Sequence, residues 1–184
     1  MPEDVITLIT SDHREVERAL DLMKKDKSTR PLLLPVTLAL LSAHSRAEEQ
    51  HVYPVVAKEA GEKGKAHHGT EEHRQAEDLG RRLLPLDPES PDFDGALEDF
   101  ASAILHHARE EEEEILPALR EAADPERLVR LGRDFVARRA GELTGGKPTK
   151  AELYEQAREL GVEGRSGMDK EKLAAEVEHA RGQG

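Results

Sequence analysis

The chain has 184 residues, a length that fits one ordinary domain with a short appendage. Aromatic residues make up only 3% and tryptophan is absent, so a core must be built from Leu, Val, Ile and Ala, which favours packed helices over a sheet. The formal net charge of −12 argues against non-specific binding to DNA or anionic lipid, and the absence of cysteine excludes disulfides, thiolate zinc sites, iron–sulfur clusters and cysteine nucleophiles.

The N-terminal segment gives no sign of targeting to a membrane or to export. It reads Met-Pro-Glu-Asp-Val-Ile, with neither the basic nor the apolar region of a signal peptide. The longest apolar stretch, around residues 32–41, falls short of the roughly 20 residues that span a bilayer, and Pro35 interrupts it. We therefore expect a soluble, cytoplasmic protein without membrane partners.

Apolar residues at helical spacing mark the first four elements, which we predict as helices over residues 3–25, 35–60, 65–84 and 93–122. Pro35 opens the second helix and Gly61 stops it, while the segment 87–92, rich in Asp and Pro, separates the third helix from the fourth. Helices of this length with short connections predict an all-α fold, an antiparallel up-down four-helix bundle.

The chain continues beyond this bundle. Asp124 and Pro125 have the signature of a helix start, and the helix should extend to about Arg139. Glycines and a proline between residues 141 and 148 then predict a linker. We accordingly divide the chain into the bundle, an additional helix with its linker, and a small helix–loop–helix module, over residues 1–122, 123–146 and 147–184.

An internal repeat is the most informative feature of the sequence. Residues 44–54 read His-Ser-Arg-Ala-Glu-Glu-Gln-His-Val-Tyr-Pro, and residues 107–117 read His-Ala-Arg-Glu-Glu-Glu-Glu-Glu-Ile-Leu-Pro. The preceding helices repeat as well, because Asp-His-Arg-Glu-Val-Glu at 12–17 aligns with Glu-His-Arg-Gln-Ala-Glu at 72–77. The chain thus contains two copies of a helix pair, each with one His on its first helix and a His-x3-Glu on its second.

The spacing of these residues predicts a metal site. A His and a Glu four residues apart lie on one helical face, so both can turn toward one point inside the bundle. Imidazole and carboxylate together suit iron, manganese or zinc, and two symmetry-related carboxylates favour a dinuclear site. Buried without a metal, such charged groups would be costly. The candidate ligands are His13, His44, Glu48, His73, His107 and Glu111.

Over roughly residues 3–120, these motifs resemble the hemerythrin-like, or HHE, cation-binding domain. The resemblance implies that the six candidates bind two iron ions in a non-haem diiron centre. It also implies that Glu48 and Glu111 are the bridging carboxylates, with an oxo or hydroxo group as a further bridge. The expected ligands of such a centre are dioxygen, peroxide and nitric oxide, and the expected context is oxidative or nitrosative stress or iron handling.

The sequence departs from the oxygen-carrying members of that family. Those carry a His-x3-His pair on the third helix, whereas Gly69 and Glu77 stand four residues on either side of His73 here. Their fourth-helix carboxylate is an Asp at a five-residue offset, whereas Glu111 follows His107 by four. One metal is therefore expected to have an open or water-filled position, which favours chemistry or sensing over reversible oxygen carriage.

Four residues could supply the ligand that this open position lacks. Tyr53 is interpreted first as a packing residue and is not one of them. The candidates are His51, His67, His68 and Glu77.

The function within this class stays open at the level of sequence. Carriage, catalysis of a catalase-like, peroxidase-like or oxidase kind, and sensing would share one ligand set, so whether the protein is an enzyme is undecided. A ferritin-like oxidase is disfavoured, because such bundles repeat Glu-x2-His on two helices and only Glu48 and His51 fit that pattern in the bundle. A metal-free structural bundle would leave the ligand-spaced repeat without a purpose.

The C-terminal module has its own resemblance. Thr149 and Glu152 form a capping-box pattern that opens a short helix to Leu160, and a last helix should begin near Asp169. With the Gly-Arg-Ser-Gly-Met loop at 164–168, this segment resembles the helix–loop–helix in the N-terminal part of the terminator Rho, and SAP modules. That implies contact with nucleic acid, but acidic and basic residues nearly balance, so a protein partner is equally expected. An iron or oxygen sensor that signals through this module is the alternative function.

Overall fold

The computed structural model describes residues 3–145, 150–162 and 164–181. Within these ranges no residue is in a strand, and the structure confirms the all-α fold with a bundle of antiparallel helices. The chain divides into two compact units, Met1–Thr144 and Gly145–Gly184. Residues 146–149, which hold the end of the predicted linker and the Thr149 cap, lie outside the described residues.

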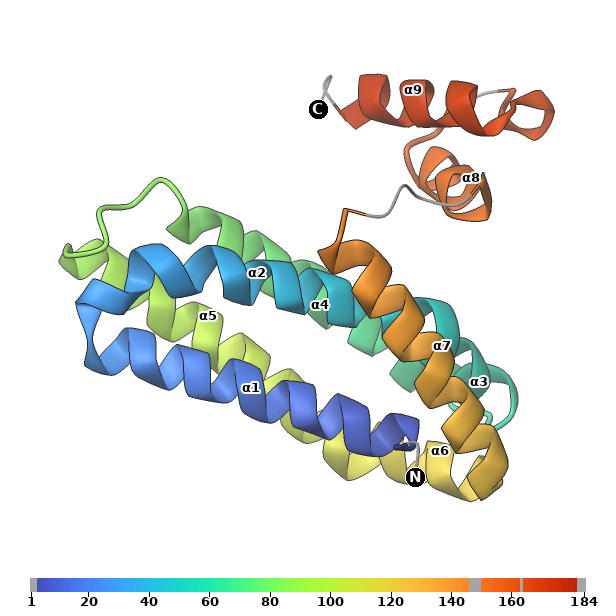
Figure 1. Cartoon of the computed structure of the whole chain (residues 1–184), viewed down its shortest axis with the longest axis horizontal. Helices are drawn as coiled ribbons and strands as arrows, with labels where there is room; N and C mark the ends of the chain where they lie inside the picture. The colour runs from blue at the N-terminus through green and yellow to red at the C-terminus, as the bar shows by residue number, and fades with distance from the viewer. Residues whose placement is uncertain (1–2, 146–149, 163, 182–184) are drawn as a thin grey trace. The chain divides into compact units, whose positions relative to one another are not determined.

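The first unit is built from long helices that run alongside one another (Figure 1). A 3-10 turn, Lys27–Thr29, joins the first two, and π-helical turns at Glu48–Val52 and Glu111–Ile115 make single long helices of α2 with α3 and of α5 with α6. The helices are α1 (Val5–Lys25), α2 (Arg30–Ala47), α3 (Tyr53–Lys58), α4 (Lys63–Leu83), α5 (Pro91–Glu110), α6 (Leu116–Ala122) and α7 (Pro125–Leu143).

Side-chain caps define where three of these helices begin. Asp4, Ser90 and Asp124 each accept a hydrogen bond from a backbone N–H in the first turn of α1, α5 and α7. Pro91 and Pro125 follow two of these caps directly, where the missing N–H of proline costs nothing. The Asp-Pro signal read from the sequence therefore marks the true start of α7.

The start of α2 differs from the prediction. The helix begins at Arg30 and carries Pro35 inside it, so the expected start at Pro35 is wrong. The Arg30 guanidinium, only 2% exposed, donates to the carbonyls of Met23 and Pro88 and pairs with Asp94 at 2.7 Å. These contacts come from three other segments of the chain. They hold the first turn of α2 in place although Pro35 has no backbone N–H to donate within the helix.

Two apolar layers fill the bundle, one on each side of a polar layer. Along α1, Val5 and Ile9 belong to one apolar cluster and Val16 and Leu20 to the other, while His13 lies between them. Each fully buried Leu, Ile or Phe contributes about 1.5–3 kcal/mol, so both clusters are strongly stabilising. The polar residues between them are therefore held in a rigid frame.

Helix α7 belongs to the first unit, whereas its sequence signals predicted a helix separate from the bundle. Leu128, Leu131 and Phe135 are part of the same apolar cluster as the start of α1. Gly132 allows a close approach of the chain, because a Cβ there would lie 2.8 Å from the carbonyl oxygen of Glu3. The bundle therefore has a fifth helix packed against α1 and α2.

The second unit consists of α8 (Lys150–Glu159), a 3-10 turn at Arg165–Gly167 and α9 (Lys170–Arg181). Four apolar side chains form its core: Leu153, Ala157, Leu173 and Val177. The helix–loop–helix arrangement expected for this segment is present, and its resemblance to Rho stays a prediction.

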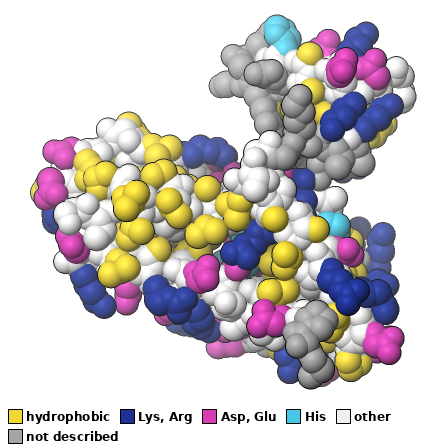
Figure 2. Space-filling model, viewed as in Figure 1, with side chains coloured by type: hydrophobic (Ala, Val, Ile, Leu, Met, Phe, Trp, Pro, Cys, Tyr) yellow, Lys and Arg dark blue, Asp and Glu magenta, His cyan; other side chains and the backbone are white. Residues whose placement is uncertain are grey.

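Among the described residues, no helix combines the length and hydropathy that crossing a bilayer requires. On the face of the bundle in Figure 2, Lys and Arg side chains are interspersed with Asp and Glu, and hydrophobic side chains gather near α2. Leu32 and Val36 are exposed hydrophobic residues of that helix.

Candidate metal centre

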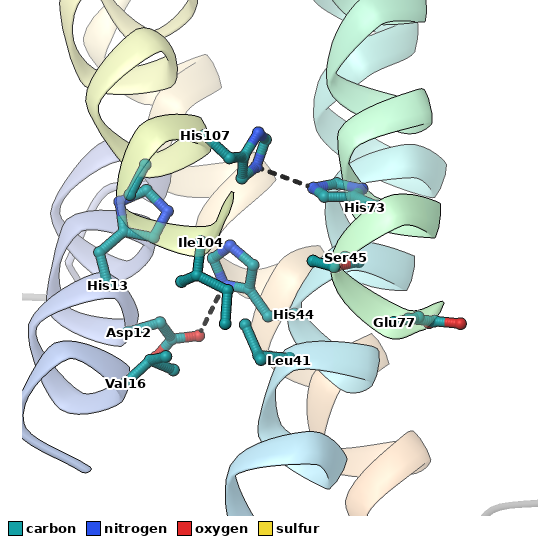
Figure 3. A pocket seen from close by; sticks show the side chains of 12 residues that line it. Asp12, His13, Val16, Leu41, His44, Ser45, His73, Glu77, Ile104 and His107 are labelled. Carbon is teal, nitrogen blue, oxygen red and sulfur yellow. Dashed lines mark hydrogen bonds and ion pairs between the residues drawn. The ribbon is translucent and has the colours of Figure 1, made fainter. Parts of the chain in front are cut away.

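The polar layer brings together all six candidate ligands from the sequence. His13 comes from α1 and His73 from α4, while the two His-x3-Glu pairs lie where α2 and α5 pass into their π turns. Figure 3 shows the four imidazoles turned toward one region of the bundle interior. The side chains involved are all buried: His13, His44, Glu48, His73, His107 and Glu111.

The donor atoms form two groups that share one carboxylate. In the first, His13 Nε2 lies 3.2 Å from Glu111 Oε2 and His44 Nε2 lies 2.9 Å from Glu48 Oε1. In the second, His73 Nε2 lies 3.2 Å from Glu48 Oε2 and 3.0 Å from His107 Nε2. Glu48 thus has one oxygen in each group, which is the arrangement of a carboxylate that bridges two ions.

A second carboxylate orients each imidazole through its other nitrogen. A carboxylate can only accept, so each Nδ1 carries a hydrogen and each Nε2 faces the centre, where a neutral imidazole offers its lone pair to a metal. The pairs are His13 with Glu112, His44 with Asp12, His73 with Glu49 and His107 with Glu72, at 2.9, 3.1, 2.9 and 2.9 Å.

These four carboxylates are not among the residues predicted from the sequence, although the repeat contained a signal for them. Asp12 and Glu72 each precede a ligand histidine, and Glu49 and Glu112 each follow a ligand glutamate, at equivalent positions of the two copies. A repeat that extends beyond the ligands themselves indicates residues that hold the ligands in place.

Several donor atoms in this layer have no partner of their own. Both oxygens of Glu48 and Glu111, and Nε2 of His13 and His44, are buried without a hydrogen bond. Their contacts with one another are close but lack hydrogen-bond geometry. Leaving such groups unsatisfied costs roughly 1–3 kcal/mol each, so a cation fits the arrangement and an empty centre is unfavourable.

Protons stabilise this layer where no metal is bound. Burial opposes charge on His44, yet Glu48 and Asp12 raise its pKa to about 10, and Glu48 and Glu49 likewise raise the pKa of His73 to about 9. Burial also opposes the ionisation of Glu48, but the facing histidines hold its pKa well below the ordinary value. A metal ion that binds here therefore displaces protons.

Comparison with protein families agrees with this geometry. The model of the hemerythrin HHE cation-binding domain matches residues 4–119. The chain belongs to the hemerythrin HHE family. Among curated proteins, a DNA nickase of Nostoc sp. is 27% identical over 113 residues, which is 60% of this chain and 32% of the relative. The chain thus spans about a third of that relative's length, and no solved structure matches the chain.

The two π turns of the hemerythrin domain start at the candidate ligands Glu48 and Glu111. In each, the first residue after the turn donates its N–H back five positions to the carbonyl of that glutamate. Pro54 and Pro117 follow at equivalent positions and have no N–H, so a regular α-helical pattern cannot continue across them. The prolines of the repeat thus favour the irregular turns that carry both carboxylates.

Tyr53 extends toward the second donor group of the hemerythrin domain. Its hydroxyl lies 3.3 Å from His73 Nε2, and the two rings stack with centroids 5.5 Å apart. Gly69 makes the space, because a Cβ there would lie 2.6 Å from the hydroxyl oxygen. Burial and the carboxylates of Glu111 and Glu48 raise the tyrosine pKa well above its ordinary value. The position that lacks a histidine therefore accommodates a phenol.

The other candidates for a missing ligand lie outside the two buried donor groups. Glu77 bonds to Arg81 at 2.8 Å and points away from the histidines in Figure 3. The His67 side chain is 70% exposed, and that of His68 is 58% exposed. Among the residues the structure describes, the two buried groups do not include His51.

A small cavity adjoins the centre of the hemerythrin domain. Its volume is about 30 Å³, and the four histidines of the two donor groups line it together with Val16, Leu41 and Ile104. That is enough for a water-sized or diatomic molecule, since one water needs roughly 10–15 Å³ by this measure. The apolar lining on one side and the imidazoles on the other suit a small, weakly polar ligand (Figure 3).

Helix α7, which follows the residues matched by the family model, packs against the centre. The Phe135 ring meets His44 edge-on with centroids 5.6 Å apart. Arg139 lies 3.1 Å from the Asp12 oxygen that holds His44. These contacts pack against His44 and hold the Asp12 carboxylate, so the fifth helix takes part in positioning a candidate ligand.

Proposed function

We propose that the protein is a non-haem diiron protein that binds or reacts with dioxygen, peroxide or nitric oxide. The observation that carries this proposal is the pair of donor groups joined by Glu48, whose buried oxygens lack any other partner. Four imidazoles and two carboxylates are borderline-hard donors that suit iron. Such chemistry would give the protein a role in oxidative or nitrosative stress, or in iron handling.

The residues of the chain divide the work at such a centre. His13 and His44 with Glu111 would hold one ion, His73 and His107 the other, and Glu48 both. A bound iron pair supplies one-electron redox chemistry and open positions for a small ligand. The outer carboxylates keep each Nε2 lone pair aimed inward, and the cavity restricts access to molecules of a few atoms.

The direct test is the metal content and optical spectrum of the protein, loaded with iron without air and then exposed to oxygen, peroxide or nitric oxide. We expect two irons per chain and a spectral change with at least one of these ligands. Fast loss of peroxide would indicate an enzyme, and a reversible spectral change would indicate a binder. Less than one iron per chain after loading would contradict the proposal and leave a structural bundle.

A sensor is the second candidate, favoured by the contacts of α7. This helix contacts His44 through Phe135 and Asp12 through Arg139, and its chain leads directly into the second compact unit. A sensor would show iron-dependent changes in backbone hydrogen exchange along α7 and within residues 150–181. Equal exchange in the iron-loaded and iron-free protein would leave only the first candidate.

Tyr53 is expected to complete the second group as a phenolate ligand. In that case the ferric protein has a visible phenolate-to-iron absorption band, and Tyr53→Phe removes the band while both irons stay bound. The matched control is Tyr154→Phe in the second unit, because the chain contains only two tyrosines. A visible spectrum that Tyr53→Phe leaves unchanged would show that Tyr53 only packs against His73.

A further inference from the structure

A second constellation of metal-binding residue types lies on the surface of the bundle, where α4 and α5 run side by side. The outer quartet, as we name it, consists of His68, Glu72, His106 and Glu110. His68 Nε2 lies 3.8 Å from Glu72 and 3.5 Å from Glu110, and His106 Nε2 lies 3.8 and 3.2 Å from the same two carboxylates. Each imidazole thus contacts both carboxylates, so the four side chains form a closed ring across two helices.

Ordinary ion pairs along a helix do not account for this ring. Pairing at i,i+4 explains the contacts of His68 with Glu72 and of His106 with Glu110, but not the two contacts between helices. In a tetrahedral site with ligand bonds of about 2.0–2.2 Å, neighbouring donors are roughly 3.3–3.6 Å apart. Donor atoms of His68, Glu72 and Glu110 lie within 4.8 Å of one another, and the four contacts around the ring, 3.2 to 3.8 Å, are close to this spacing.

The ring is both accessible and anchored. The side chains of His68 and His106 are 58% and 59% exposed, so an ion can reach them from solvent. Glu72 is only 12% exposed and is fixed by its bond to His107. With neutral imidazoles the ring carries two negative charges, which attract a cation. Two imidazoles with two carboxylates favour zinc or ferrous iron over calcium or magnesium.

One carboxylate joins the surface ring to the buried centre. Glu72 directs Oε1 toward both histidines of the outer quartet, and its Oε2 accepts the hydrogen bond from His107 Nδ1 at 2.9 Å. The opposite nitrogen of His107 belongs to the second ligand group. A single side chain therefore contacts an outer ring and an inner ligand at the same time.

We propose that the outer quartet is a second metal site, which takes a divalent transition-metal ion and couples it through Glu72 to the buried centre. The ion draws electron density from the Glu72 carboxylate and so weakens the hydrogen bond that makes His107 a strong donor. Weaker donation and an added nearby charge both favour the lower oxidation state of the buried metal. This coupling rests on the proposed diiron function, whereas the outer site itself does not.

The binding test compares zinc uptake by two proteins, the wild type and the His68→Ala, His106→Ala double variant. After equilibrium dialysis against Zn²⁺, we expect one more zinc per chain in the wild type, both before and after loading with iron. The control variant, His67→Ala with His179→Ala, also loses two exposed histidines and should match the wild type. Equal zinc in the wild type and the double variant would overturn the proposal.

The coupling test measures the reduction potential of the iron-loaded protein with and without Zn²⁺, while iron content is followed in the same samples. Zinc should raise the potential of the wild type and of the control variant, and leave the double variant unchanged. An unshifted wild-type potential with zinc bound would overturn the coupling. Failure to load iron would contradict the diiron function instead, and the zinc difference between the two iron-free proteins would still decide the outer site.

Discussion

Glu48→Gln is expected to remove both ions from the hemerythrin domain, whereas Glu111→Gln should mainly weaken one. The difference follows from the geometry, because Glu48 has an oxygen in each donor group and Glu111 belongs to the first group alone. Loss of a residue that only orients a ligand costs about 10–100-fold in metal affinity, so loss of a shared ligand should exceed that. Glutamine keeps the shape of the side chain and fills the same buried space.

The measurement is iron content after anaerobic loading and desalting, with circular dichroism to verify the helices. Glu113→Gln is the matched control, since this exposed residue lies in the same run of glutamates and should leave two irons bound. If Glu48→Gln kept both irons in a folded protein, the bridging role of Glu48 would be refuted. If Glu48→Gln and Glu111→Gln lost the same amount of iron, the two donor groups would not bind their ions separately, contrary to the geometry.

The metal-free protein is expected to lose stability as the pH rises from about 7 to 10, by an amount on the order of a few kcal/mol. Folding raises the pKa of His44 to about 10 and of His73 to about 9, from 6.5. A raised histidine pKa stabilises the fold fully below pH 6.5, and this stabilisation is lost as the pH passes through the raised values. Glu48, whose pKa is lowered, stabilises the fold above its ordinary value of 4.5 and loses this effect on acidification.

Urea unfolding of the iron-free and iron-loaded protein at pH 7, 8.5 and 10 measures this dependence. Iron replaces the protons on the ligand histidines, so the loaded protein should be more stable than the iron-free one at each pH and should show a flatter dependence from pH 7 to 10. Parallel curves for the two forms would mean that other groups set the alkaline limit and that the buried histidines are not protonated in the iron-free state.

Much of the fold was readable from local signals. Asp124 with Pro125 marked the start of α7, and Gly61 marked the end of the helix that carries the first repeat, because caps and breakers act on their own turn. The start of α2 was not readable in this way. Arg30 is buried by contacts with Met23, Pro88 and Asp94, and the pattern of apolar residues in α2 does not indicate these partners.

The sequence by itself determined the two helix pairs and the six residues that face the centre. The repeated His-x3-Glu fixes one helical face of each second helix, and the aligned segments 12–17 and 72–77 add one His on each first helix. Only the tertiary structure decided which carboxylate holds which imidazole, that Tyr53 fills the space left by Gly69, and that α7 covers the site. Each of these depends on how far one helix is shifted along its neighbour. The packing of the two apolar layers sets that shift, and this packing cannot be read from the pattern of any single helix.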